Sequence, residues 1–237
     1  MFSYIYTELS SRQLEIQSVF AQIQVLESEQ RQNNGQEELL NSLKGLLFVL
    51  LYGCIEYSVT ESVKVTESAI SLQNLSLSQV KPTLITRFLY KEFDALHSAG
   101  RKQKWQKRLE FMQKLIDDDI ISENICDNLE LPTDGKNIRS TQLKAIFDTF
   151  SIDTDTDTDT DTDTDTNTQL LTPQWKGRLK DIVDNRNAIA HGNKTASAVG
   201  KPIFITDLKE RIDEVNRFCT EFITIFVNYI QNKEYKR

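Results

Sequence analysis

Glycine, proline, histidine and cysteine are all scarce in this chain of 237 residues, which has 8, 4, 2 and 3 of them. Because glycine and proline punctuate turns, their scarcity favours long uninterrupted helices over a β-sandwich or barrel. Two histidines, with no pair of cysteines at C-x-x-C spacing, exclude a zinc site of any usual type. The odd number of cysteines is typical of a protein from a reducing cytoplasm.

Outside one low-complexity tract, the chain also lacks an excess of charge of either sign. Residues 153–166 read DTDTDTDTDTDTDT, and their seven aspartates account for the whole net charge of −7. The tract has no apolar side chain to bury and only one sign of charge, so we expect a disordered loop within a single domain of residues 1–237. Weak calcium binding is the less favoured alternative, because the tract lacks the turn glycine and the spaced glutamate of a calcium loop.

No hydrophobic run is long enough to cross a membrane. The most apolar segment, residues 46–55, reads LLFVLLYGCI and has ten residues, whereas a bilayer needs about 20. We interpret it as part of a buried core helix. The N-terminal residues turn polar within the first ten, which is not typical of a signal peptide. We therefore expect a cytoplasmic protein without a membrane partner.

Apolar residues recur every three or four positions along most of the chain, which indicates amphipathic helices. Thr172 and Pro173 are typical of an N-cap and first helical residue, and Thr206 is a second candidate cap. Residues 194–205 are expected to form a loop. No segment shows the alternation of a strand, so the predicted fold class is all-α, an antiparallel helical bundle. The predicted helices span 3–32, 36–72, 83–97, 101–118, 140–150, 173–190 and 207–232.

Arg186 occupies an unusual place in its predicted helix. The apolar stripe there runs through residues 175, 179, 182 and 189, and Arg186 fills the missing position on this core-facing side. Arginine is rarely buried without a partner. One interpretation is a structural ion pair. The other is a guanidinium aimed into a cleft to hold phosphate, which suits its planar fork of donors.

His191 stands at the predicted end of the same helix, where Gly192 is the expected C-terminal stop. It lies roughly 140° around an ideal helix from Arg186, so the two converge only if the helix frays or if two copies meet. Asn187 precedes His191 by four residues on the same face, where its amide is placed to orient the imidazole. The alternative is a favourable interaction of His191 with the helix dipole.

Residues 101–108, RKQKWQKR, contain five basic residues and one tryptophan. Arg101, Lys104 and Arg108 share one helical face. The favoured interpretation is a solvated face with the tryptophan packed inward. The alternative is a strip that contacts an RNA backbone while Trp105 stacks on a base. His97 has no evident partner in the sequence, and we expect a structural or surface residue.

Two segments resemble the HEPN family. The stretch RNAIAHG, residues 186–192, is similar to the Arg-x4-6-His motif of that family, with a polar residue after the arginine. The stretch LLYGCIEYSVTESV, residues 50–63, resembles the early central helix of the MAE-like and RiboL-PSP-like branch, which carries a glutamate, here Glu56. The helical stripe through Tyr52 and Val59 also assigns Glu56 to a core-facing side. The resemblance spans roughly 36–70 and 172–232.

The resemblance implies an all-helical domain of prokaryotic toxin–antitoxin and antiviral systems, many of which are metal-independent ribonucleases that pair the motif across a homodimer. It implies Arg186 and His191 as catalytic residues, with Asn187 in support and Glu56 pairing with Arg186. The implied partners are RNA, a second copy and a cognate antitoxin or neighbouring defence protein, and no cofactor is expected. Toxins of this kind that are neutralised by nucleotidylation carry His-x-Tyr. Asn193 stands in the place of that tyrosine, so we do not expect such control.

The residue types suit cleavage of RNA by its own 2′-hydroxyl. Histidine transfers protons near neutral pH, and arginine stabilises charge developing on the phosphate. Two other functions remain open from the sequence. One is a non-catalytic HEPN module that binds a nucleotide or scaffolds a defence complex. The other is a purely structural helical protein in which Arg186 and His191 only decorate a helix end.

Overall fold

A computed structural model describes residues 1–30, 36–118, 120–121, 137–153 and 169–237. Within these ranges the regular elements are helices, and the only β-type pairings are two isolated bridges. The prediction of an all-α fold is therefore confirmed. Apart from Asp153, the Asp-Thr tract and its predicted loop conformation lie outside the described residues. The α-helices are α1 (Ser3–Gln30), α2 (Glu37–Ser71), α3 (Pro82–Phe88), α4 (Tyr90–Ser98), α5 (Lys104–Ile116), α6 (Ser140–Phe150), α7 (Pro173–Ala190), α8 (Ala196–Gly200) and α9 (Ile205–Gln231).

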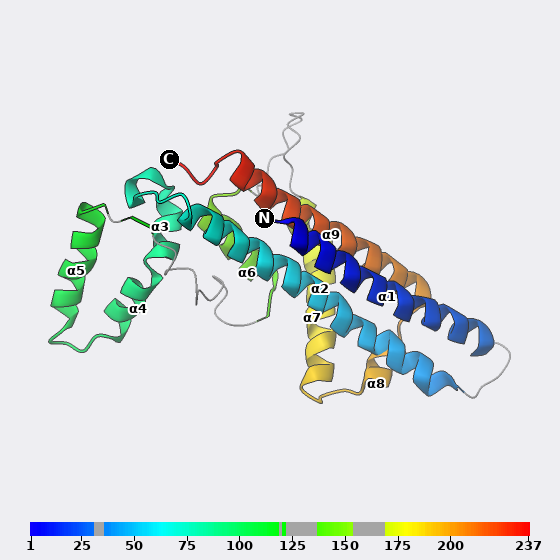
Figure 1. The fold of residues 1–237 in the computed structure, drawn as a ribbon. Helices are drawn as coiled ribbons and strands as arrows, with labels where there is room; N and C mark the ends of the chain where they lie inside the picture. Colours follow the sequence, from blue (N-terminus) through cyan, green and yellow to red (C-terminus); the bar gives the residue numbers. More distant parts are fainter. Residues whose placement is uncertain (31–35, 119, 122–136, 154–168) are drawn as a thin grey trace.

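Three long helices, α1, α2 and α9, run side by side along the body of the molecule (Figure 1). The apolar stripe of α9 is buried along its whole length, from Leu208 to Tyr229. Helix α2 lies at the centre and contacts α1, α7, α8 and α9. Its length and composition would suit a membrane span, but more than half of its most apolar window is buried inside the bundle. This burial supports the interpretation of residues 46–55 as part of a core helix.

Several predicted boundaries differ from the structure. The helix predicted over 101–118 spans only Lys104–Ile116, as α5. The helix predicted over 83–97 is divided into α3 and α4 at Leu89, whose backbone leaves the helical region at φ −103° and ψ 23°. The change of direction lets the consecutive residues Phe88 and Leu89 both enter the core. The loop predicted over 194–205 contains the short helix α8. Helix α9 begins at Ile205 with Phe204 as its N-cap, so the prediction of Thr206 as the cap was wrong.

Two glycines allow the backbones of α8 and α2 to lie in direct contact. A Cβ atom on Gly45 of α2 would lie 2.0 Å from the carbonyl oxygen of Ala196, and one on Gly200 of α8 would lie 2.0 Å from that of Asn41. The side chain of Thr195 caps α8 by accepting a hydrogen bond from the N–H of Ala198 at 3.1 Å. This contact fixes the chain immediately after the end of α7.

Helices α4 and α5 form a hairpin that stands away from the long helices (Figure 1). The rings of Phe93 and Phe111 pack at a centroid distance of 5.0 Å, and Lys114 forms an ion pair with Glu92. No residue of either helix is buried. His97, in the last turn of α4, is exposed, so it is a surface residue.

Candidate functional site

The predicted ends of α7 are both confirmed. The side chain of Thr172 accepts a hydrogen bond from the N–H of Trp175 at 3.2 Å, and Pro173 begins the helix. At the other end, Gly192 has a φ of 70°, and the N–H of Lys194 returns to the carbonyl of Ala188 at 3.0 Å. This left-handed glycine closes the helix and leaves His191 as its C-cap residue.

The guanidinium of Arg186 is held by an aromatic ring and two amides. Its Cζ lies 4.5 Å from the centre of the Tyr52 ring on α2, a cation–π distance. Its Nη1 donates to Oδ1 of Asn137 at 3.1 Å and to Oδ1 of Asn187 at 2.9 Å. The side chain is half-buried at the edge of the core, as the stripe of α7 predicts.

The three partners of Arg186 among the described residues are neutral, which distinguishes it from Arg178, the other arginine of α7. Arg178 forms ion pairs with Glu210 and Glu214. No carboxylate forms an ion pair with Arg186 in the part of the chain that the structure describes. The structural ion pair that the sequence left open is therefore not observed. Among the described residues no carboxylate therefore neutralises the guanidinium, an arrangement that suits an anionic ligand.

Tyr52 is buried, and its hydroxyl connects two further groups. It accepts a hydrogen bond from the N–H of Ile138 at 3.1 Å and donates to Oε1 of Glu56 at 3.4 Å. Burial raises the pKa of Tyr52, and this outweighs the opposite effects of the Ile138 N–H and the Arg186 charge. The hydroxyl is therefore protonated at neutral pH and remains a donor.

Glu56 does not occupy its predicted place. Its side chain is exposed, and within the described ranges it forms no ion pair with Arg186. It accepts a hydrogen bond from the hydroxyl of Tyr52, whose ring contacts Arg186. The prediction of a core-facing glutamate was wrong because α2 is covered on several sides. A single 4-3 stripe does not identify the strip of α2 that remains open.

A short extended segment, residues 137–139, fastens α7 to α2. Asn137 accepts from Arg186, and the N–H of Ile138 donates to Tyr52. Arg139 forms an ion pair with Asp184 of α7 at 2.7 Å. Hydrogen bonds from Lys180 and then Arg139 hold the pKa of Asp184 below its usual range. Sequence reasoning missed this segment, because a contact between residues 137 and 186 leaves no periodic signal.

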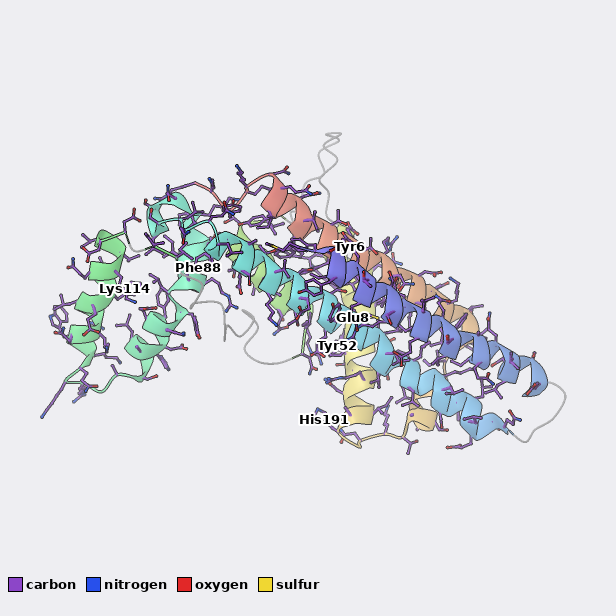
Figure 2. All side chains as sticks on the ribbon, viewed as in Figure 1. Tyr6, Glu8, Tyr52, Phe88, Lys114 and His191 are labelled. Atoms are coloured by element: carbon purple, nitrogen blue, oxygen red, sulfur yellow. The ribbon has the colours of Figure 1, made fainter. Side chains whose placement is uncertain are left out.

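His191 is exposed at the end of α7, at the lower edge of the molecule (Figure 2). Its backbone N–H donates to the carbonyl of Asn187 at 3.0 Å. The side chain of Asn187, however, bonds to Arg186 and not to the imidazole. The predicted role of Asn187 in orienting His191 is therefore not observed. Among the described residues, nothing brings the side chains of Arg186 and His191 together within one chain.

The candidate RNA strip lies on the α4–α5 hairpin, apart from α7 (Figure 1). Arg101, Lys104 and Arg108 are exposed, and so is Trp105, at 66% of its surface. The favoured interpretation, an inward-packed tryptophan, is therefore wrong. The guanidinium of Arg108 lies 5.9 Å from the tryptophan ring. RNA contact by this strip stays a prediction.

A groove lies at the opposite end of α7, between that helix and α9. Its volume is about 550 Å³, and the stacked rings of Trp175 and Phe218 belong to its lining. Four carboxylates surround it, from residues 210, 213, 214 and 221. This charge disfavours RNA, so we do not assign the site to this groove. The described part of the chain also holds no cluster of His, Cys, Asp or Glu that suits a metal ion.

Comparison with known proteins agrees with the family resemblance found in the sequence. The family model described as RiboL-PSP-HEPN matches residues 7–228, which extends well beyond the segments in which the sequence motifs occur. The match includes most of α1, all of α2 and the whole of α7 with Arg186 and His191. No curated protein and no solved structure gave a significant match.

Proposed function

The chain belongs to the RiboL-PSP-HEPN family, and from this premise we propose that it is a metal-independent endoribonuclease. We propose further that it acts in the cytoplasm as a toxin or antiviral effector that a cognate antitoxin or neighbouring defence protein controls. One observation carries the proposal. The end of α7 presents Arg186, whose partners in the described part of the chain are neutral, and an exposed histidine, His191, five residues later.

In the proposed reaction, the 2′-hydroxyl of a nucleotide attacks the adjacent phosphorus atom. A bond forms between the 2′-oxygen and phosphorus, and the bond from phosphorus to the 5′-oxygen breaks. The 2′-hydroxyl loses its proton to a base, and the departing 5′-oxygen gains one from an acid. Arg186 stabilises the negative charge that develops on the phosphorane oxygens. The products carry a 2′,3′-cyclic phosphate and a 5′-hydroxyl.

A homodimer supplies the second proton-transfer group in this proposal, because each chain offers only one histidine at the site. The exposed strip of α2 beside Tyr52 has an apolar character that suits such an interface. Leu46 is 44% exposed and Val49 is 36% exposed, on the same side of α2 as Glu56. Across a two-fold axis the same strip and the end of α7 meet their own copies, so both motifs enter one cleft.

The dimer proposal predicts that Val49→Asp weakens self-association and RNA cleavage together. A charge at the centre of the interface must be desolvated without a partner. Sedimentation at micromolar concentration is expected to give about twice the chain mass of 27.3 kDa for the wild type and a larger monomer fraction for the variant. Leu39→Asp, on an exposed residue at the start of α2, is the matched control. A fully active wild-type monomer would contradict the paired site.

A non-catalytic module that binds a nucleotide or scaffolds a defence complex is the alternative function. The separation of His191 from Arg186 within one chain favours it. In such a module Arg186 would hold a phosphate without cleavage. Nucleotide binding that depends on Arg186, with no cleavage of any RNA, would support this alternative.

The deciding experiment is cleavage of RNA with and without EDTA by wild-type protein and variants. We expect cleavage to survive EDTA, to yield 2′,3′-cyclic phosphate ends and to spare DNA, which lacks the 2′-hydroxyl. His191→Ala is expected to lower the rate by about 10²-fold or more through loss of proton transfer. Arg186→Ala is expected to have a similar effect through lost charge stabilisation. Glu56→Gln is expected to lower the cleavage rate by a smaller factor.

The matched control for these variants is Lys194→Ala, which removes an exposed charge close to the motif. We expect it to cleave RNA at a rate close to that of the wild type. Undiminished cleavage by the double variant Arg186→Ala, His191→Ala would refute the site. Loss of activity in EDTA, recovered by added metal, would refute the mechanism.

A further inference from the structure

The guanidinium of Arg186 has one occupied nitrogen and one open edge. Both hydrogen bonds that it donates to described residues leave from Nη1, one to Asn137 and one to Asn187. A guanidinium has five N–H donors, and Nη1 carries two of them. The other three, on Nε and Nη2, have no partner among the residues that the structure describes. Nε and Nη2 together form an edge that matches two oxygens of a carboxylate or phosphate.

Other arginines of this chain show how the same edge binds an anion. Three of them donate from both Nε and Nη2 to carboxylate oxygens. They are Arg87 with Glu67, Arg178 with Glu214 and Glu210, and Arg211 with Asp181. In Arg211 the two nitrogens lie 3.0 and 2.8 Å from the carboxylate oxygen. The edge that these arginines give to internal carboxylates is therefore the one that Arg186 offers to an anion from outside.

The position of Asn137 is fixed by the two residues that follow it. The N–H of Ile138 donates to the hydroxyl of Tyr52 at 3.1 Å, and Arg139 forms an ion pair with Asp184 at 2.7 Å. The ring of Tyr52 also lies against the guanidinium. In the planar guanidinium the Nε–Nη2 edge lies opposite Nη1. Asn137 therefore holds Nη1 on one side and leaves the binding edge facing away from its amide.

We propose that Asn137 is a positioning residue, which directs the Nε–Nη2 edge of Arg186 toward a single RNA phosphate. The inference rests on the proposed function, because it concerns the same arginine. A phosphodiester has two terminal oxygens, which this edge binds as a pair. The amide oxygen of Asn137 accepts from Nη1 as a carboxylate would, but it carries no charge. It therefore orients the guanidinium without competing with the phosphate for its charge.

Asn137→Asp tests whether the neutral amide matters. The variant keeps the shape and the acceptor, so urea unfolding of the full chain should keep the wild-type midpoint or move to a higher one. The new carboxylate neutralises the guanidinium, so affinity for a single-stranded 2′-O-methyl RNA should fall by about tenfold or more. The slope of log affinity against log salt concentration should become shallower by about 0.7, the value for one phosphate contact on a single strand.

The matched control is Asn193→Asp, the same change on an exposed residue just beyond His191. No described contact joins Asn193 to Arg186. Its carboxylate is screened by solvent, so it should lower the affinity by less than about threefold. An equal loss in both variants would attribute the effect to general repulsion of RNA and would contradict the proposal.

Asn137→Ala separates orientation from charge. The guanidinium keeps its charge, so affinity for the 2′-O-methyl RNA should fall by less than about threefold. Its orientation is no longer fixed, so kcat for RNA cleavage should fall by about tenfold or more while KM changes little. A purely structural role for Asn137 predicts the opposite order, in which the aspartate variant resembles the wild type and the alanine variant is impaired throughout. That order would overturn the proposal.

A double-mutant cycle tests whether Asn137 acts through Arg186. In the Arg186→Ala background, Asn137→Asp should change the affinity for 2′-O-methyl RNA by less than about threefold, because no guanidinium remains to be neutralised. An equal effect with and without the arginine would refute the positioning role, and so would wild-type affinity that does not depend on Arg186. RNA of this kind cannot be cleaved. Binding that depends on both residues, in a protein that cleaves no RNA, would refute the ribonuclease and support the phosphate site.

Discussion

Tyr52 supports Arg186 with its ring and two other groups with its hydroxyl. Tyr52→Phe keeps the ring and leaves the buried N–H of Ile138 without its acceptor, so we expect a loss of about 1–3 kcal/mol in the free energy of unfolding. Tyr52→Leu also removes the cation–π contact. RNA cleavage should therefore fall further in the leucine variant than in the phenylalanine variant. Urea denaturation and cleavage rates measure the two effects, and equal cleavage by both variants would contradict a role for the ring.

Arg186 shows what periodicity along one helix predicts. The buried residues Trp175, Leu179 and Ile182 define the side on which Arg186 lies, so its position at the edge of the core follows from α7 alone. The partners of Arg186 cannot be predicted from α7. Tyr52 and Asn137 come from other parts of the chain, and their approach depends on how α2 and residues 137–139 pack against α7. Glu56 was assigned wrongly for the same reason, since packing decides which strip of α2 remains open.

At the scale of the elements, the contact between α2 and α8 depends on the absence of two side chains. Gly45→Ala and Gly200→Ala would each place a Cβ atom 2.0 Å from a backbone oxygen, and a backbone cannot move aside as a flexible side chain does. We expect each variant to lose about 1–3 kcal/mol or more of stability, as in overpacked cores. Thermal or urea unfolding measures the loss.

Gly177 is the matched control for that experiment. It also lies within a helix, α7, but a Cβ atom there would meet no atom within 4 Å. Gly177→Ala should therefore increase stability by about 0.5–1 kcal/mol, because alanine is the better helix former. A similar loss in all three variants would indicate that the tight approach of α8 to α2 is not the cause.

The length of an element determined how well the sequence predicted it. Helices α6 and α7 begin and end where the spacing and caps place them, α1 begins at its predicted residue, and both ends of α2 lie within one residue of their predicted positions. The predicted end of the first helix, residue 32, lies outside the described residues. Helix α8 has five residues, too few for a period to be recognised, and its place depends on the glycine contact with α2. The division between α3 and α4 arises from tertiary packing of Phe88 and Leu89, which no local pattern records.

At the scale of the whole molecule, stability is unevenly distributed between the body and the α4–α5 hairpin. In the body of the molecule the aromatic side chains of α6 and α9 are packed in the core, whereas neither helix of the hairpin contains a buried residue. We therefore expect backbone amides of α4 and α5 to exchange with deuterium much faster than those of α2 and α9. Hydrogen exchange read by mass spectrometry at low micromolar concentration measures the difference. Equal protection of hairpin and body would show that the hairpin is anchored more firmly than its contacts suggest.

The neutral surroundings of Arg186 also determine what an arriving phosphate must displace. An arginine held in an internal ion pair has a resident counter-ion, and a ligand has to compete with it before it can bind. Tyr52, Asn137 and Asn187 orient the guanidinium without neutralising it, so an incoming anion breaks no ion pair of Arg186 with the residues that the structure describes. The orientation of the guanidinium is fixed before the phosphate arrives, and the phosphate then competes for it with anions in the surrounding solution.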